Sequence, residues 1–297
     1  GVKYTHPDLA ANMWTNPKES ENGNDDDGNG YVDDIHGYNF VENGPITWDK
    51  AVIGIDGSNN GDSGHGTHVA GTIAAVNNNG IGVAGVAGGS GKNDGVRLMS
   101  CQIFSGGKSA ADAATARAVK YAADNGACII QCSYGYSNAS GGSNMTTDKR
   151  FKEFSPLLVE ALEYFYKSKN CEALDGGIAI YAAGNDGKLV SSYPGAYCRN
   201  ISVTAIGPDG LPAAYTNYGP GCNIAAPGGE VSGFSGGAKA GILSTVCSEL
   251  PDTQDTDYAF LQGTSMACPH VSGVAALGLS YALKIGKKFT RDEYIAM

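Results

Sequence analysis

The sequence predicts an α/β protein built on a mostly parallel sheet. From Val69 onward, short β-rich runs alternate with helical patterns, and this alternation is typical of parallel strands joined by helices. With 297 residues, 42% of them hydrophobic, the chain is long enough to bury a full core. No linker or internal repeat divides it, so we expect a single domain over residues 1–297, cut from a longer product at both ends.

The elements are expected in a regular order. Helices are predicted at 65–76, 109–124, 156–169 and 265–284, and strands at 96–103, 127–133, 177–183, 201–205, 223–226 and 242–246. The third helix should begin with Ser155 as its N-cap and Pro156 at its first position. The last helix carries apolar residues on most of its faces, so we expect it to be central and buried.

Charge and hydropathy exclude several classes of protein. The formal net charge is −10, and seven acidic residues lie between Lys18 and Asp34, which disfavours binding to nucleic acid. No apolar run approaches the roughly 20 residues of a membrane helix, so no membrane span is predicted. Eight cysteines are too few for a small disulfide scaffold, and their number alone does not indicate an oxidising or a reducing cellular compartment.

Three glycine-punctuated segments each carry one reactive polar residue: His65 in 64–72, Asn185 in 182–187 and Ser265 in 263–270. Such loops gather beyond the carboxyl ends of strands in an open parallel sheet. Ser265 would open a helix, where free N–H groups and the helix dipole favour a developing oxyanion. His65 has the pKa range of a general base near neutral pH, and Asn185 can donate to the same oxyanion.

Each of these residues has a structural alternative when taken alone: a helix cap for the serine, a left-handed turn for the asparagine and a packed core position for the histidine. Their joint occurrence favours nucleophilic catalysis. A zinc site is disfavoured because His65 and His68 are three residues apart, without the glutamate of the helical zinc-protease motif. We expect His68 and His270 to be structural.

The three segments, together with Tyr4-Thr5-His6-Pro7-Asp8-Leu9, resemble the signatures of the subtilisin-like serine proteases, the subtilase family, in type and chain order. The resemblance implies a central, mostly parallel twisted sheet flanked by helices on both faces. It also implies hydrolysis of peptide bonds through an acyl-enzyme, with Ser265 as nucleophile, His65 as general base and Asn185 as oxyanion donor. The segment Ser133, Tyr134 and Gly135 resembles the backbone strand that lines the substrate pocket.

The third member of the triad is expected outside these 297 residues. In the family an Asp precedes a Ser or Thr and then a Gly, and Gly1 resembles that glycine, which places the Asp two residues upstream. Asp62 is a poor substitute because it shares a turn with His65 and cannot reach behind the imidazole. Loss of the orienting carboxylate would lower turnover by roughly 10⁴. The alternative is a catalytically silent relative that binds peptides or partners; an esterase is disfavoured because Gly263-Thr264-Ser265-Met266-Ala267 fails the Gly-x-Ser-x-Gly pattern.

The acidic segment resembles a calcium loop. Its expected ligands alternate along the chain: Asp25, Asp27, Asn29, the carbonyl of Tyr31, and Asp33. Position twelve is His36 rather than Glu, so a bidentate ligand must come from elsewhere or be absent, and a solvated acidic loop is the alternative. The turn at 77–83 resembles a second calcium-binding turn of the family.

We therefore predict a calcium-stabilised, secreted or cell-surface serine endopeptidase that acts on peptide or protein substrates and binds its own propeptide. For the cysteines, a disulfide between Cys171 and Cys198 and a pair of reduced thiols are equally favoured. Cys128 and Cys132 lie about 13 Å apart on one strand and cannot bond to each other. Cys101 and Cys268 are expected in the core.

Overall fold

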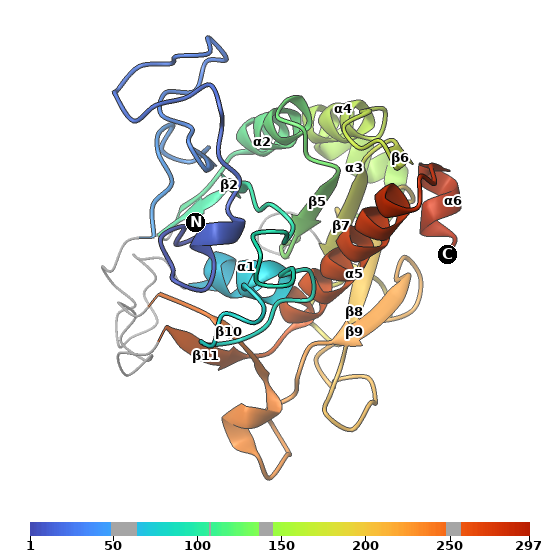
Figure 1. Ribbon diagram of the computed structural model, residues 1–297. Helices are drawn as coiled ribbons and strands as arrows, with labels where there is room; N and C mark the ends of the chain where they lie inside the picture. Colours follow the sequence, from blue (N-terminus) through green and yellow to red (C-terminus); the bar gives the residue numbers. More distant parts are fainter. Residues whose placement is uncertain (49–63, 107, 137–144, 248–256) are drawn as a thin grey trace. The chain divides into compact units, whose positions relative to one another are not determined.

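The computed structural model describes residues 1–48, 64–106, 108–136, 145–247 and 257–297 (Figure 1). These residues form two compact units that are interleaved in sequence. Unit 1 comprises Gly1–Asn125 and Ser244–Ala259, and unit 2 comprises Gly126–Leu243 and Phe260–Met297. Asp62 lies outside the described residues, and the single domain expected over residues 1–297 stays a prediction.

The sheet of unit 2 is parallel, as the alternation of strands and helices predicts. Its four strands are β5 (Ile129–Cys132), β7 (Ile178–Ala182), β8 (Ile201–Ile206) and β9 (Ile224–Pro227), in that order across the sheet. Ile129 pairs with Ile178, and Ile180 pairs with Ile201. The central strand β7 is buried along its whole length, as expected for a parallel strand covered on both faces.

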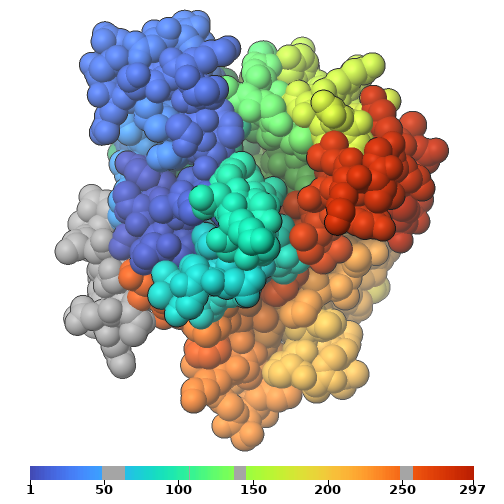
Figure 2. Space-filling model, in the orientation of Figure 1, coloured from blue at the N-terminus to red at the C-terminus, as the bar shows by residue number. Residues whose placement is uncertain are grey.

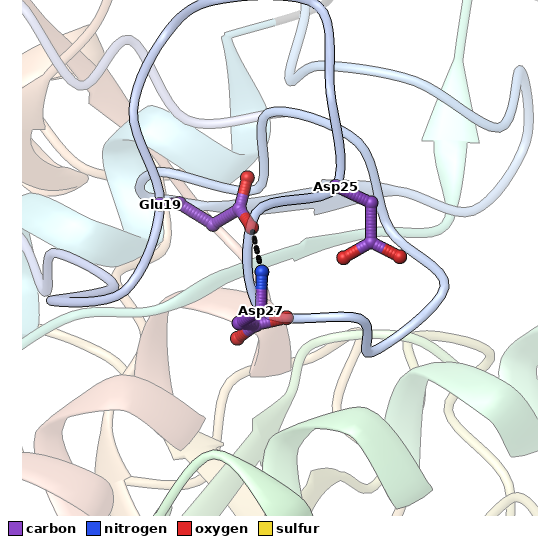
Figure 3. Close-up of side chains that lie close together, drawn as sticks. All are labelled: Glu19, Asp25 and Asp27. Atoms are coloured by element: carbon purple, nitrogen blue, oxygen red, sulfur yellow. Dashed lines mark hydrogen bonds between the residues drawn. The ribbon is translucent and has the colours of Figure 1, made fainter.

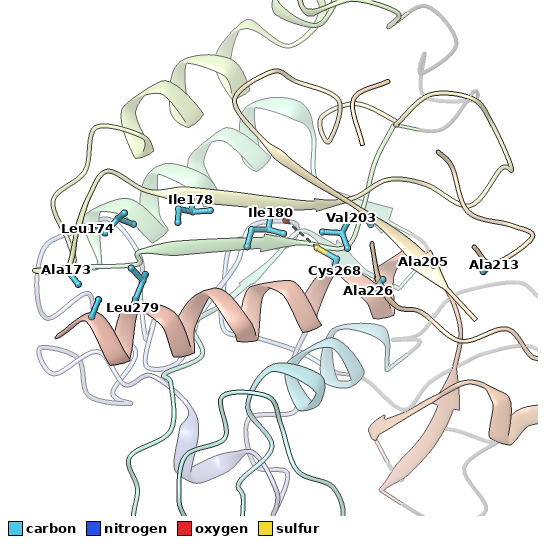
Figure 4. Close-up of a cluster of buried hydrophobic side chains, with 13 residues drawn as sticks. Ala173, Leu174, Ile178, Ile180, Val203, Ala205, Ala213, Ala226, Cys268 and Leu279 are labelled. Carbon is cyan, nitrogen blue, oxygen red and sulfur yellow. Dashed lines mark hydrogen bonds between the residues drawn. The ribbon is translucent and has the colours of Figure 1, made fainter. Parts of the chain in front are cut away.

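Helices lie on both faces of this sheet. The long helix α5 (Thr264–Lys284) packs along one face, where Ala267, Cys268 and Leu279 meet side chains of β7 and β8 (Figure 4). The helices α3 (Asp148–Phe154) and α4 (Pro156–Phe165) lie beyond the other face (Figure 4). The flanked parallel sheet implied by the sequence is therefore confirmed.

The long helix differs from its prediction in its second half. Most residues of its first two turns are buried, whereas Val274 and Tyr281 are 61% and 62% exposed. In Figure 2 the red atoms of this half form part of the surface of unit 2. By length and composition α5 could cross a membrane, and 44% of its most apolar window is buried inside the protein.

The start of α4 is as predicted, with Ser155 as its N-cap and Pro156 as its first residue. The Ser155 side chain makes no capping bond, and its Oγ pairs instead with the hydroxyl of Tyr136 at 2.8 Å. The helix has 10 residues rather than about fourteen. The disulfide considered between Cys171 and Cys198 is not formed, and all eight cysteines are free thiols. The Cys171 thiol faces Cys128 instead, and burial together with this neighbour raises the pKa of Cys128 to about 12.

Unit 1 is built around two helices, α1 (His65–Ala74) and α2 (Asp112–Asp124), and a parallel pair of strands, β1 (Gly37–Asn39) and β2 (Ser100–Gln102). Its core contains a cluster of aromatic rings packed edge to face: Tyr31, Tyr38, Phe40 and Tyr121. Both α2 and β2 are shorter at their N-terminal ends than predicted.

The remaining elements are short. They are η1 (Ala10–Asn12), β3 (Phe104–Ser105), β4 (Lys108–Ser109), β6 (Leu174–Asp175), η4 (Gly237–Ala240), β10 (Ile242–Thr245), β11 (Tyr258–Leu261), β12 (Phe289–Thr290) and α6 (Arg291–Ile295). The pair β3 and β4 contributes to the late start of α2, because β4 includes Ser109, the residue at which the helix is predicted to begin.

Candidate active site

Ser265 lies in the first turn of α5 in unit 2. Gly263 is the N-cap and has φ 145°, a backbone conformation that favours glycine. The Ser265 side chain is half-buried, and its Oγ donates to the carbonyl of Ser133 at 3.4 Å. The backbone N–H of Ser265 makes no hydrogen bond with the described part of the chain, as expected for a group in the first turn of a helix. A hydroxyl and a free N–H donor thus occur on one residue.

Asn185 follows β7 and is held beside this turn by Thr264. The Oδ1 atom of Asn185 accepts from both the backbone N–H and the hydroxyl of Thr264, each at 2.8 Å. Because a backbone N–H can only donate, the amide oxygen must face Thr264. The Nδ2 group is left without a bond to any described residue and is available as a donor. Thr264 also accepts from the Gly184 N–H at 3.2 Å and is fully buried, so this orientation is fixed from two sides.

The expected substrate strand follows β5. Ser133 is fixed by its neighbours: its Oγ donates to the carbonyl of Ser265 at 2.7 Å and accepts from Gln131 at 2.6 Å. The Tyr134 ring stacks edge to face on Tyr181 at 5.6 Å, and burial raises the pKa of Tyr134 well above its usual value. Gly135 is exposed, and its backbone makes no hydrogen bond within the described ranges. Its N–H and C=O can therefore pair with an extended peptide.

His65 is the first residue of α1 in unit 1. It follows Gly64, the N-cap, whose φ is 69°, and its side chain is half-buried. The next residue, Gly66, lies against the start of the chain: a Cβ there would be 2.6 Å from the carbonyl oxygen of Gly1. The first residue of the sequence and the candidate base are thus neighbours within unit 1. His68 is buried and its Nε2 lies 3.2 Å from the Ala259 carbonyl.

In unit 1 the structure brings two of the expected calcium ligands together. Asp25 accepts from the N–H groups of Asn29 and Gly30 at 3.0 and 2.8 Å, and Asp27 also accepts from Asn29 N–H. A third carboxylate, that of Glu19, joins them: one oxygen of each residue lies within 4.8 Å of the others (Figure 3). Sequence reasoning missed Glu19 because it precedes the ligand pattern, although it lies in the same acidic segment.

The other expected ligands make separate contacts. The Asn29 Oδ1 atom accepts from the Tyr31 N–H at 2.8 Å, and its Nδ2 donates to buried Asp34 at 3.0 Å. The carboxylate of Asp33 accepts from the N–H groups of Asn22 and Gly23 at 2.9 and 3.0 Å. Asp33 thus closes the preceding turn rather than joining the three-carboxylate cluster.

The 77–83 turn closes around a buried carboxylate. Asp8 is fully buried, and its two oxygens accept from Asn79 Nδ2 at 2.6 Å and from the Val83 N–H at 3.0 Å. The hydroxyl of Tyr258 donates to the same carboxylate at 3.3 Å. The segment Tyr4–Leu9 and this turn, which the sequence singled out separately, are therefore joined through Asp8.

The fold and these motifs are those of a serine protease of the α/β class, and the comparisons with known proteins agree. The model of the subtilase family matches residues 1–294, and the chain belongs to that family. It is 28% identical to thermitase from Thermoactinomyces vulgaris over 93% of this chain and 71% of thermitase. It is 34% identical to the extracellular basic protease of Dichelobacter nodosus, over 77% of this chain and 33% of that protein.

Among solved structures, proteases from Pseudoalteromonas arctica PAMC 21717 match with a TM-score of 0.62 and 29% identity. That match covers all of this chain and 78% of the other. Apart from thermitase, the first curated relatives are matched over only 33% to 51% of their own length.

Proposed function

We propose that the protein is a serine endopeptidase that hydrolyses peptide bonds through an acyl-enzyme. Ser265 Oγ attacks the carbonyl carbon while His65 takes its proton, and the carbonyl oxygen becomes an oxyanion. Asn185 Nδ2 and the Ser265 N–H donate to this oxyanion. His65 then protonates the leaving amine, and water, deprotonated by His65, hydrolyses the ester. The observation that carries the proposal is the Asn185 amide, which Thr264 orients with its donor unbonded to any described residue, beside the helix turn that carries Ser265.

The base needs an orienting carboxylate, and we place it two residues ahead of Gly1. Support comes from the contact of Gly1 with Gly66, because a residue just upstream of Gly1 would then lie close to the first turn of α1. A carboxylate there would hold the imidazole of His65 in the tautomer that accepts the serine proton. Peptide or protein substrates would add a strand along Ser133–Gly135, where the Gly135 backbone is unbonded.

A fluorophosphonate probe tests the nucleophile. The chain extended upstream to include an Asp-Ser-Gly or Asp-Thr-Gly start should be labelled at Ser265, and Ser265→Ala should abolish labelling. Asn185→Leu should lower kcat by about 10²–10³ and leave KM nearly unchanged, since the lost donor acts mainly on the oxyanion. An extended chain that binds peptides but is neither labelled nor active would instead support the silent relative.

We further propose that the acidic loop binds calcium as a structural ion. The ligand chemistry supports this, because carboxylate and amide oxygens are the donors that calcium prefers. The ion would be held by Asp25 and Asp27, whose side chains accept hydrogen bonds from backbone N–H groups of the loop. Bound calcium would stabilise the folded state by mass action. A secreted or cell-surface location, with a propeptide as a further partner, completes the proposal; the name of the Dichelobacter nodosus relative supports the location.

A further inference from the structure

Glu19 has a buried carboxylate that is only half satisfied. The residue is 9% exposed and lies six positions before Asp25 in the sequence. One oxygen, Oε1, accepts from the backbone N–H groups of Asp26 and Asp27 at 2.8 and 3.0 Å, and Figure 3 shows the bond from Asp27. The other oxygen, Oε2, is buried and has no hydrogen-bond partner among the described residues. Such an oxygen is costly to bury, so its position calls for a partner.

The surroundings of Glu19 are negative. Oxygens of Glu19, Asp25 and Asp27 lie within 4.8 Å of one another, and none of these carboxylates pairs with a described Lys, Arg or His. Like charges at this separation repel one another. The N–H donors of the loop already serve Asp25 and Asp27, and a cation would both pair with Oε2 of Glu19 and offset the negative charge.

We infer that Glu19 is a ligand of a divalent cation, calcium by its all-oxygen donor set, which it holds together with Asp25 and Asp27. The inference rests on the calcium binding proposed for this loop and supplies the carboxylate that His36 cannot provide at position twelve. The ligand comes from upstream of the loop instead of downstream. Two backbone N–H groups hold Oε1, so the side chain is oriented before the ion arrives, which lowers the entropic cost of binding.

Calorimetry with calcium chloride on the chelator-treated 297-residue chain tests this assignment. Glu19→Gln keeps the acceptor at Oε1 but replaces Oε2 by an amide that donates and repels a cation. We expect its calcium Kd to rise about tenfold or more. Glu21→Gln is the matched control, because Glu21 is exposed and makes no hydrogen bond with the described residues, and its Kd should equal that of the wild type.

Thermal melting separates a ligand from a merely structural side chain. In chelator, Glu19→Gln should melt at or above the wild-type temperature, because one of three crowded charges is gone and the new amide can donate to Asp25 or Asp27. In excess calcium the order should reverse, since the wild type gains more from binding. A variant that is less stable by the same amount in both conditions would show that Glu19 only supports the fold. If Glu19→Gln fails to fold, Glu19→Asp is the variant to use, because it keeps the charge but shortens the side chain. Folded Glu19→Asp should bind calcium more weakly than the wild type, and an unchanged calcium affinity would overturn the assignment.

The double variant Asp25→Asn, Asp27→Asn separates calcium binding by the loop from the role of Glu19 as one of its ligands. If it abolishes calcium binding while Glu19→Gln binds as the wild type does, the loop is the site and the role of Glu19 is overturned. If neither change alters binding, or the wild type binds no calcium at millimolar concentration, the loop site and the role of Glu19 fail together. The peptidase proposal is judged separately by labelling at Ser265.

Discussion

Replacing Tyr121 by Phe should destabilise unit 1 by about 1.5–3 kcal/mol, the range for a hydrogen bond to a charged group. The Tyr121 hydroxyl donates to Oδ2 of Asp34 at 2.7 Å, and Asp34 is fully buried. The other described side-chain donors to this carboxylate are Asn16 and Asn29, at 2.9 and 3.0 Å. Burial and the bond to Asp34 raise the pKa of Tyr121, so the phenol remains a neutral donor over the pH range in which the protein is studied.

The control for this prediction is Tyr31→Phe. The ring of Tyr31 packs edge to face on that of Tyr121 at 5.0 Å, but its hydroxyl makes no hydrogen bond within the described ranges. We expect a change of at most about 0.5 kcal/mol there. Urea unfolding should show a lower midpoint for Tyr121→Phe at an unchanged slope. Equal midpoints for the two variants would refute the view that the phenol hydroxyl stabilises the buried carboxylate.

Three further predictions follow from single contacts. Thr264→Val should lower kcat by about tenfold or more, but it should lower kcat little further in an Asn185→Leu background, because both changes act on the Asn185 Nδ2 donor. Additive effects of the two changes in steady-state kinetics would contradict this. Burial lowers the pKa of His6 below 6.5, so the stability advantage of the wild type over His6→Gln should be full above about pH 6.5 and shrink as the pH falls. A constant difference in urea melts from pH 7 to 5 would exclude that linkage. Gly71→Ala should destabilise the folded protein by about 1–3 kcal/mol despite the better helix propensity of Ala, because the new Cβ would lie 2.2 Å from Thr245 Oγ1. A raised melting temperature of the variant would refute this prediction.

The sequence predicted the elements of unit 2 well because their signals are local. The apolar runs that became β7 and β8 are bounded by polar or glycine-containing turns, and the residues of α5 have no helix breaker before Pro269. Local rules predicted Ser155 as the N-cap of α4 but not its bond, because its hydroxyl pairs with that of Tyr136, which lies 19 positions away. The exposed second half of α5 could not be predicted either, because composition alone does not show which face is covered.

In the candidate sites too, residues with a local sequence signal could be predicted, and residues brought in only by the fold could not. The motifs around Ser265 and Asn185 predicted a helix start and a turn after a strand, and both residues lie on such elements; their chemical roles stay predictions. The alternating oxygens of the acidic loop led to the calcium proposal, but they do not include Glu19, because no periodic pattern connects it to Asp25. The role proposed for Glu19 rests on the folded chain, in which one of its carboxylate oxygens is unpaired beside Asp25 and Asp27.

The helix that carries His65 shows how packing can override propensity. Gly66 and Gly71 each cost α1 about 1 kcal/mol relative to Ala, which would count against a helix if propensity decided alone. Both positions meet another part of unit 1 too closely for a side chain: Gly66 meets the carbonyl of Gly1, and Gly71 meets the hydroxyl of Thr245. That hydroxyl donates to the carbonyl of Thr67 at 2.7 Å, so the close approach also satisfies a polar group of the helix. Gly66 and Gly71, each within about one turn of Thr67, therefore allow α1 to pack closely against other segments of unit 1. This close packing holds His65 in a defined position although the local sequence disfavours a helix.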